Sequence, residues 1–230
     1  MKIVMITCAA IGLVTVAATI AVGHVKSERA TEEFGKRLMT GFLPHRLACA
    51  SCHIDAGAEP GDLSLADAIA HYPRIEERID KCVTENMNGR ALREDGDEMK
   101  AMIAWLRFLG AENAAMGASQ RQSHDPPAFR KPSRAADPKA GENLFEKRCA
   151  DCHGKDGAGL PAALDPEKGY LFPPLWGTES FPDASEMNDP STLARFIKAK
   201  MPLGRADLDD EQAWDIAAFV ASKPRPRLAR

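Results

Sequence analysis

Cys49-Ala-Ser-Cys52-His53 is the stretch that decides the fold, and a second copy, Cys149-Ala-Asp-Cys152-His153, follows later in the chain. Each is a C-x-x-C-H pentapeptide, the attachment signal of a c-type haem. Two thiols three positions apart can both bond to the vinyl groups along one edge of a porphyrin, and the next residue presents its imidazole to the iron. The four cysteines and two histidines could instead close one zinc site. We favour two covalently bound haem c groups, with His53 and His153 as iron ligands, because each copy has its own helical surroundings.

The composition is that of a soluble globular protein. The chain has 230 residues, a formal net charge of −3, 44% hydrophobic and 27% charged residues, which is enough for two small domains. It has no dense basic stripe, so we expect no binding to nucleic acid. Aromatic content is only 6%, which suits domains whose core is largely a porphyrin.

The N-terminal residues 1–23 are a weakly basic start followed by an apolar run. They are typical of a secretory signal peptide, but the run is also long enough to span a bilayer as an uncleaved anchor. Both alternatives place the rest of the chain in the periplasm of a bacterium, either soluble or anchored to the inner membrane. Cys8 lies in this run, so only Cys82 is left without a haem or a partner in an oxidising compartment.

Hydrophobic periodicity predicts an all-α fold. In the region 30–112, a helix from Thr31 should end at Gly41, and residues 73–86 should form a helix that carries Cys82 on its apolar face. A final helix should start near Asp97 and end at Gly110. Its apolar stripe consists of Met99, Met102, Ile103, Leu106 and Leu109.

A linker-like segment, 113–136, separates this region from residues 137–222, where the same plan recurs. Asp137-Pro138 should start a helix before the second pentapeptide, and Asp209 begins a capping box for the final helix. The basic tail 225–230 reads as a solvated, frayed end. A class I cytochrome c domain has this order of elements: a helix, the haem motif, a loop, a second helix and a final helix. We therefore predict two such domains in tandem, each wrapped around one covalent haem.

The two haems should differ in their distal ligands. Methionine is a common sixth ligand of cytochrome c iron. In the second domain, Met201 lies in Lys200-Met201-Pro202-Leu203-Gly204, just before the final helix, and Met187 is its competitor.

The first domain has no such Met-Pro loop, but Cys82 falls between the haem motif and the last helix. Its thiolate could bind the iron and lower the haem potential, or it could be an inert buried cysteine. Arg78, four residues earlier, shares its helix face; it would favour the thiolate and could pair with an anionic substrate.

Several further motifs then identify a known family. They are Cys49 to Gly57, Arg78-Ile79-Asp80-Lys81-Cys82, Met87-Asn88-Gly89-Arg90-Ala91-Leu92, Phe172-Pro173-Pro174-Leu175-Trp176-Gly177, Ser180-Phe181, Lys200 to Gly204 and Ala213-Trp214-Asp215. With these motifs, nearly the whole chain after residue 23 resembles the dihaem thiosulfate dehydrogenases. These are related to the haem-thiolate subunit of the sulfur-oxidising cytochrome complex.

The resemblance implies an oxidoreductase that couples two thiosulfate ions into tetrathionate, or runs in reverse. Electrons would pass from the first haem to the second and on to an external acceptor, which we expect to be a small cytochrome c. It also implies that Cys82 is both an iron ligand and the catalytic thiol. Met201 would be the distal ligand of the second haem, and Lys200 would take that place in one redox state. We expect Arg78 and Arg90 to hold the substrate anion.

The sequence departs from the family pattern in several places, among them a short stretch before Arg78. Glu85 and Asn86 stand where the family usually has an Arg-Ser pair, and Ala184-Ser185-Glu186-Met187 replaces a Gly-rich segment. Two alternatives therefore stay open. One is a non-enzymatic dihaem electron carrier in which Cys82 tunes one potential, and the other is an enzyme that acts on another sulfur anion.

Overall fold

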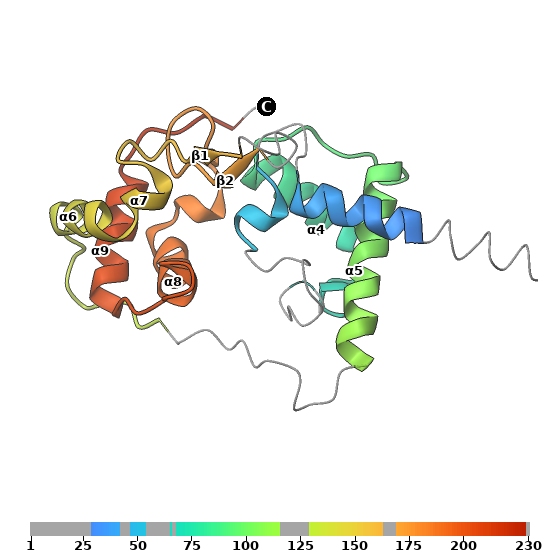
Figure 1. The fold of residues 1–230 in the computed structure, drawn as a ribbon, viewed down its shortest axis with the longest axis horizontal. Coiled ribbons are helices and arrows are strands. Elements are labelled where there is room, and N and C mark those ends of the chain that lie inside the picture. The colour runs from blue at the N-terminus through green and yellow to red at the C-terminus, as the bar shows by residue number, and fades with distance from the viewer. Residues whose placement is uncertain are drawn as a thin grey trace, which may run out of the picture.

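The computed structural model describes residues 29–41, 47–53, 65, 68–115, 129–162 and 169–228. They form two mostly helical halves, N-terminal and C-terminal in sequence, which lie side by side (Figure 1). The predicted signal or anchor at 1–23, with Cys8, lies outside the described residues. Within the described ranges, none of the helices is both long and apolar enough to cross a membrane.

Among the described residues of the N-terminal half, five helical elements follow the helical residues 29–40. They are η1 (Cys49–Ser51), α3 (Ala68–His71), α4 (Ile75–Lys81), η2 (Cys82–Asn86) and α5 (Asp97–Ala115). The first helix ends at Gly41 as predicted. α5 starts at Asp97, but the predicted end at Gly110 is wrong, since the helix continues to Ala115. A glycine inside a helix costs only about 1 kcal/mol relative to alanine, and the alanine-rich turn that follows favours helix.

The C-terminal half starts with α6 (Pro138–Arg148), capped by the Asp137 side chain as predicted. The other helices are α7 (Ala150–His153), η4 (Glu186–Asn188), α8 (Pro190–Lys200) and α9 (Asp210–Ala221). The predicted capping box of Asp209 and Gln212 is confirmed at the start of α9. A short antiparallel hairpin, β1 (Leu160–Pro161) with β2 (Tyr170–Phe172), was not predicted. Three residues or fewer per strand are too short for a periodicity of two to show in sequence.

Each half has its own cluster of buried apolar side chains. The predicted stripe of α5 is confirmed as the centre of the N-terminal cluster, and α9 with Phe145 forms the centre of the C-terminal one. The two clusters are in contact, because Phe181 from the C-terminal half is buried in the N-terminal cluster and Met187 packs against both.

In both halves the first helix crosses the final helix at a glycine. A Cβ atom at Gly35 would lie 1.9 Å from the carbonyl oxygen of Ala101 in α5. A Cβ atom at Gly141 in α6 would lie 2.0 Å from the carbonyl oxygen of Asp215 in α9. Only glycine allows the two backbones to approach this closely, so both crossings depend on the missing side chain.

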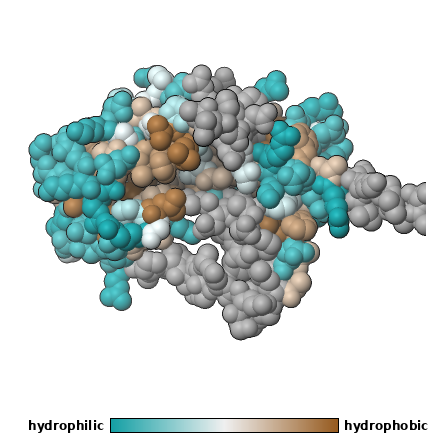
Figure 2. Space-filling view, viewed as in Figure 1, coloured by the Kyte–Doolittle hydropathy of each residue, from teal (hydrophilic) through white to brown (hydrophobic). Residues whose placement is uncertain are grey.

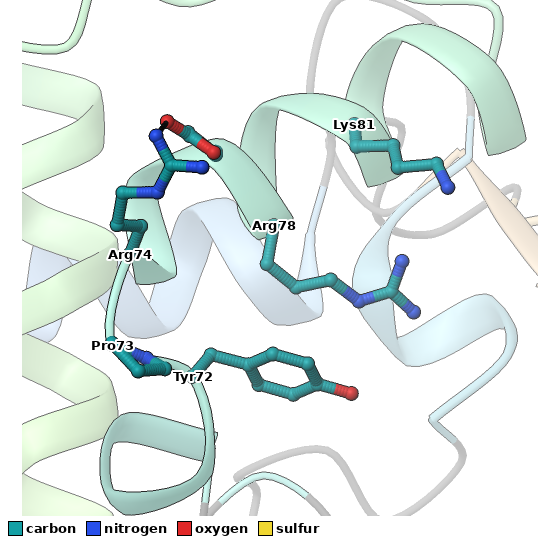
Figure 3. A pocket seen from close by; sticks show the side chains of 6 residues that line it. Tyr72, Pro73, Arg74, Arg78 and Lys81 are labelled. Atoms are coloured by element: carbon teal, nitrogen blue, oxygen red, sulfur yellow. Dashed lines mark ion pairs between the residues drawn. The ribbon is translucent and has the colours of Figure 1, made fainter.

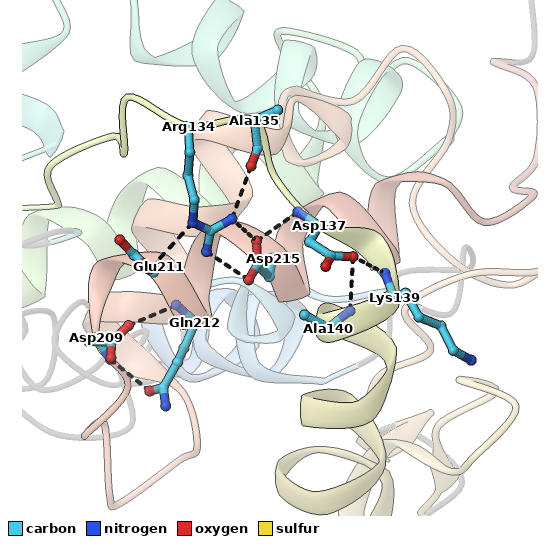
Figure 4. Close-up of polar contacts among 9 residues, drawn as sticks. All are labelled: Arg134, Ala135, Asp137, Lys139, Ala140, Asp209, Glu211, Gln212 and Asp215. Carbon is cyan, nitrogen blue, oxygen red and sulfur yellow. Dashed lines mark hydrogen bonds and ion pairs between the residues drawn. The ribbon is translucent and has the colours of Figure 1, made fainter.

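An ion pair fastens the segment before α6 to the final helix (Figure 4). The Arg134 guanidinium donates two hydrogen bonds of 2.8 Å to the buried carboxylate of Asp215. The same carboxylate accepts a 2.8 Å hydrogen bond from the backbone N–H of Asp137. Burial acts to raise the pKa of Asp215, but the bonds from Arg134 and Asp137 outweigh it and hold the pKa below its usual value.

The expectation that residues 225–230 are a frayed tail is wrong for the described part, up to residue 228. Arg225 donates hydrogen bonds to the carbonyl oxygens of Leu175 and Val220 and lies over the ring of Phe181. The carbonyl oxygen of Arg227 accepts a 3.3 Å hydrogen bond from Asn88 of the N-terminal half. The alternating prolines remove backbone donors and favour an extended chain, so the tail can lie against both halves.

We expect Asp215→Asn to lower the free energy of unfolding by about 2 kcal/mol at pH 7, because a charge-assisted bond to Arg134 is lost. The folded pKa of Asp215 lies below the unfolded value. The stabilisation by Asp215 is therefore present above the unfolded pKa of about 3.9 and lost as the pH falls through the folded pKa.

Urea unfolding of the holoprotein between pH 3 and pH 7 measures how this stabilisation depends on pH. Glu211→Gln, which removes the exposed partner of Arg134, should cost less than about 0.5 kcal/mol. An Asp215→Asn effect that is the same at pH 3 and pH 7 would contradict the role of the ion pair.

Gly141→Ala should lower the free energy of unfolding by about 2–3 kcal/mol, because the new methyl group forces α6 away from α9. The matched control is Asn143→Ala, two residues along α6 and exposed, which should leave stability unchanged within about 0.5 kcal/mol. Thermal unfolding of the holoprotein variants measures both. Equal melting temperatures for the two variants would show that the crossing tolerates a side chain.

Candidate haem and sulfur-anion site

The two pentapeptides fold into the same helical turn. In both, the first cysteine's carbonyl oxygen accepts hydrogen bonds from the N–H groups of the second cysteine, at 3.2 Å, and of the histidine, at 2.8 Å for His53 and 2.9 Å for His153. This turn keeps the thiols and the imidazole of each motif close together. Five cysteines, Cys49, Cys52, Cys82, Cys149 and Cys152, are free of disulfides.

His153 is held in the state that an iron ligand requires. Its ring is buried, and its Nδ1 lies 2.9 Å from the carbonyl oxygen of Pro173. A carbonyl oxygen can only accept, so Nδ1 carries the proton and Nε2 keeps a free lone pair. Burial lowers the pKa of His153, although the bond to Pro173 opposes this, so the ring is neutral near pH 7. This environment fits a metal-bound imidazole.

The surroundings of the second pentapeptide are apolar enough for a porphyrin. Figure 2 shows apolar side chains clustered on one face of the C-terminal half, whereas its outer rim is hydrophilic. Leu160, Leu171 and Leu203 are among the exposed large hydrophobic residues. Cys149 packs against the same cluster as Met201, the residue that caps the end of α8. Lys200 is the last residue of α8 and is half-buried.

The zinc alternative finds no support in the described parts of the chain. No group of three or more His, Cys, Asp or Glu side chains in those ranges gathers closely enough to hold a metal ion.

Cys82 lies near the first pentapeptide, at the point where α4 passes into the π-helical turn η2. The pKa of Cys49 is raised to about 12 and that of Cys52 to about 11. Burial is the largest cause of both rises, and the charge of the nearby Cys82 is the second largest. Such π turns in helices are frequent at functional sites. Burial is also the largest influence on Cys82 itself and raises its pKa, whereas Arg78 and a hydrogen bond with Asn86 oppose the rise.

A cavity of about 330 Å³ lies along α4. Its lining is Tyr72, Pro73, Arg74, Glu77, Arg78 and Lys81. Cys82 is not among its lining residues, but two residues that line it, Arg78 and Lys81, are close enough for their charges to act on the thiol. Figure 3 shows the charged ends of Arg78 and Lys81 extending to the same side, while Arg74 turns to Glu77, with which it forms an ion pair. The Arg78 guanidinium also lies 5.7 Å from the centre of the Tyr72 ring. The arrangement can receive an anion at Arg78 and Lys81, whose charges also act on Cys82.

The structure brings only some of the predicted anion-binding residues together. Arg78 lines the cavity, whereas Arg90, on the segment after η2, is not among its lining residues. Sequence reasoning did not select Lys81, although it lies three residues after Arg78 and so shares its helix face. It also missed Glu186, which reaches Arg78 and Lys81 from the other half. No local signal could reveal Glu186, because the contact joins positions more than a hundred residues apart.

Known proteins resemble this chain over most of its length. Residues 136–220 match the family model of the cytochrome c oxidase, cbb3-type, subunit III. A thiosulfate dehydrogenase of Allochromatium vinosum is 38% identical over 200 residues, which cover 80% of this chain and 72% of that protein. One of Stutzerimonas stutzeri is 31% identical over 200 residues, which cover 82% of this chain and 63% of that protein.

The chain belongs to the thiosulfate dehydrogenase family. The structure of the thiosulfate dehydrogenase TsdBA from Marichromatium purpuratum, in its as-isolated form, matches with a TM-score of 0.71 and 28% identity. The match covers 84% of this chain but only 45% of that one. The resemblance inferred from the motifs is thus confirmed, and so is a c-type cytochrome fold that binds haem c. The roles of individual residues in this thiosulfate dehydrogenase family member stay predictions.

Proposed function

We propose that the chain is a dihaem c-type cytochrome that joins two thiosulfate ions into tetrathionate, or runs the reverse reaction. The observation that carries the proposal is the position of Cys82, next to the first pentapeptide and within reach of the charges of Arg78 and Lys81, which line a cavity along α4. The two halves are proposed as tandem class I cytochrome c domains, 30–112 and 137–222, joined by the linker 113–136. This division is supported by a feature that the two halves share, since in each of them the first helix crosses the final helix at a glycine.

Haem c, when bound, supplies an iron that takes up electrons from sulfur and passes them on. Cys49 and Cys52 would hold one haem and Cys149 and Cys152 the other, with His53 and His153 as proximal ligands. We propose Cys82 as the distal ligand of the first haem. Met201 would be that of the second, with Lys200 taking its place in one redox state.

The proposed chemistry of Cys82 balances in two steps. Its thiolate and the terminal sulfur of one thiosulfate form a sulfur–sulfur bond, and two electrons are released in the direction of the first haem. The terminal sulfur of a second thiosulfate then attacks the sulfur joined to Cys82. This attack forms tetrathionate and returns the thiolate as leaving group.

Cationic side chains have a direct role in this scheme, because each substrate carries two negative charges. Arg78 would hold the first ion against Cys82 and reduce the repulsion between thiolate and substrate. Arg90 is proposed as a second anchor. Electrons would leave by the second haem to a small cytochrome c in the bacterial periplasm, with residues 1–23 as export signal or membrane anchor.

We expect Cys82→Gly to abolish thiosulfate oxidation, because no thiol remains to form the adduct. The holoprotein is assayed with thiosulfate and ferricyanide, and in reverse with tetrathionate and a reduced dye. Peptide mass and a pyridine haemochrome spectrum should still report two attached haems. The wild type should show a low-spin thiolate signal in electron paramagnetic resonance that the variant lacks. Thr84→Ala, two residues away, is the matched control and should keep both signal and turnover. Turnover by Cys82→Gly would refute the proposed mechanism.

Arg78→Gln should raise KM for thiosulfate about tenfold, equivalent to about 1.4 kcal/mol, because a charge-assisted contact to the anion is lost. Arg74→Gln is the control within the same cavity, since Arg74 is already paired with Glu77; its KM should change less than about twofold. Steady-state kinetics at constant ionic strength measure both, because salt screens exposed charges. Equal changes in the two variants would mean that the cavity acts only through its overall charge.

A further inference from the structure

The cationic side of the cavity already has a carboxylate within reach, and it comes from the C-terminal half. Glu186 Oε2 lies 3.9 Å from the guanidinium of Arg78, and Glu186 Oε1 lies 3.6 Å from Lys81 Nζ. Lys81 Nζ is also 3.8 Å from Glu85 Oε2. Three cations, Arg74, Arg78 and Lys81, therefore face three carboxylates, Glu77, Glu85 and Glu186. An arriving anion meets a site whose formal charges already balance.

The backbone of Glu186 is fixed to the helix that carries Cys82. The side-chain oxygen of Asn86 accepts a 3.0 Å hydrogen bond from the backbone N–H of Glu186 and a 2.9 Å bond from the hydroxyl of Ser185. Ser185 is buried, and its hydroxyl caps η4 by accepting from the N–H of Met187. These bonds do not involve the Glu186 carboxylate, so its backbone stays in place when the side chain moves.

The Glu186 side chain itself is held loosely. Its relative exposure is 55%, and both of its ion pairs are longer than a charged hydrogen bond of about 2.8 Å. Exposed pairs of this kind contribute little to stability, so a ligand of higher charge can take the place of the carboxylate. The charge of Glu186 also reaches Cys82, whose pKa it raises.

We propose that Glu186 is an internal competitor for the substrate site, displaced from Arg78 and Lys81 when a sulfur dianion binds. Because the carboxylate competes with the substrate, it sets how strongly the site binds a dianion. Because Glu186 belongs to the C-terminal half, a movement of that half relative to α4 would change the affinity of the site. A dianion with several oxygens can bind Arg78 and Lys81 at the same time. It carries two negative charges where the carboxylate of Glu186 carries one, so it interacts more strongly with the two cations. The proposal rests on the proposed function for the identity of the sulfur anion, but the displacement itself can be measured by equilibrium binding.

The test is Glu186→Gln in the full-length holoprotein, which removes the charge and keeps the backbone hydrogen bond to Asn86. Binding of thiosulfate and of sulfate, a dianion without a sulfane sulfur, is measured by isothermal titration calorimetry. Both should bind about fivefold to tenfold more tightly to the variant, since one repelling charge within about 4 Å is removed. KM for thiosulfate should fall by a similar factor while kcat changes less than about twofold. Glu211→Gln, which makes the same charge change in the same half but remote from Cys82, should leave binding unchanged.

Three outcomes would overturn the proposal. Unchanged dianion binding in Glu186→Gln would show that the carboxylate does not compete, and weaker binding would show that it positions the cations instead. A wild type that binds dianions but oxidises no thiosulfate would contradict the proposed function alone; tighter binding of sulfate by Glu186→Gln would then still support the competitor. A fall in kcat together with unchanged binding would assign Glu186 to the contact between the halves and would also overturn the proposal.

Discussion

The contact of α6 with the backbone of α9 at Gly141 is the constraint on which the C-terminal half depends. α6 ends one residue before Cys149, so the crossing also fixes where the second pentapeptide begins. Arg134, Asp137 and Asp215 fasten the same junction with charge-assisted bonds. The N-terminal half repeats the crossing at Gly35. In both halves, the first cysteine of the haem-attachment motif packs against the buried apolar cluster to which the final helix belongs.

Much of the helical layout could be predicted from sequence, because its determinants are local. The caps at Asp137 and Asp209 and the buried stripe of α5 each depend on residues within a few turns of one another. Glycine at position 110 was a misleading local signal, since one glycine does not outweigh the favourable turn after it. The hairpin β1–β2 escaped prediction, because strands of two and three residues are too short to show a periodicity in the sequence.

Only those site residues that lie on the same helical segment could be predicted to be neighbours. Arg78 and Cys82 are four residues apart and share a face, so their proximity follows from helix geometry. The contacts of Asn86 with Ser185 and Glu186 do not, because they join the two halves. Asn86 and Glu186 are a hundred residues apart in the sequence, and in the fold they meet. A substitution at one of these positions would therefore act on the other half as well.

The bond from Asn88 to the carbonyl oxygen of Arg227 has a consequence for how the molecule matures. Asn88 stands two residues after the π turn that begins at Cys82, and Arg227 is synthesised almost 140 residues later. This bond can form only when the last residues of the chain are present. The junction between the halves near η2 is therefore closed by the C-terminal segment, so a chain that loses its last few residues would lose this bond.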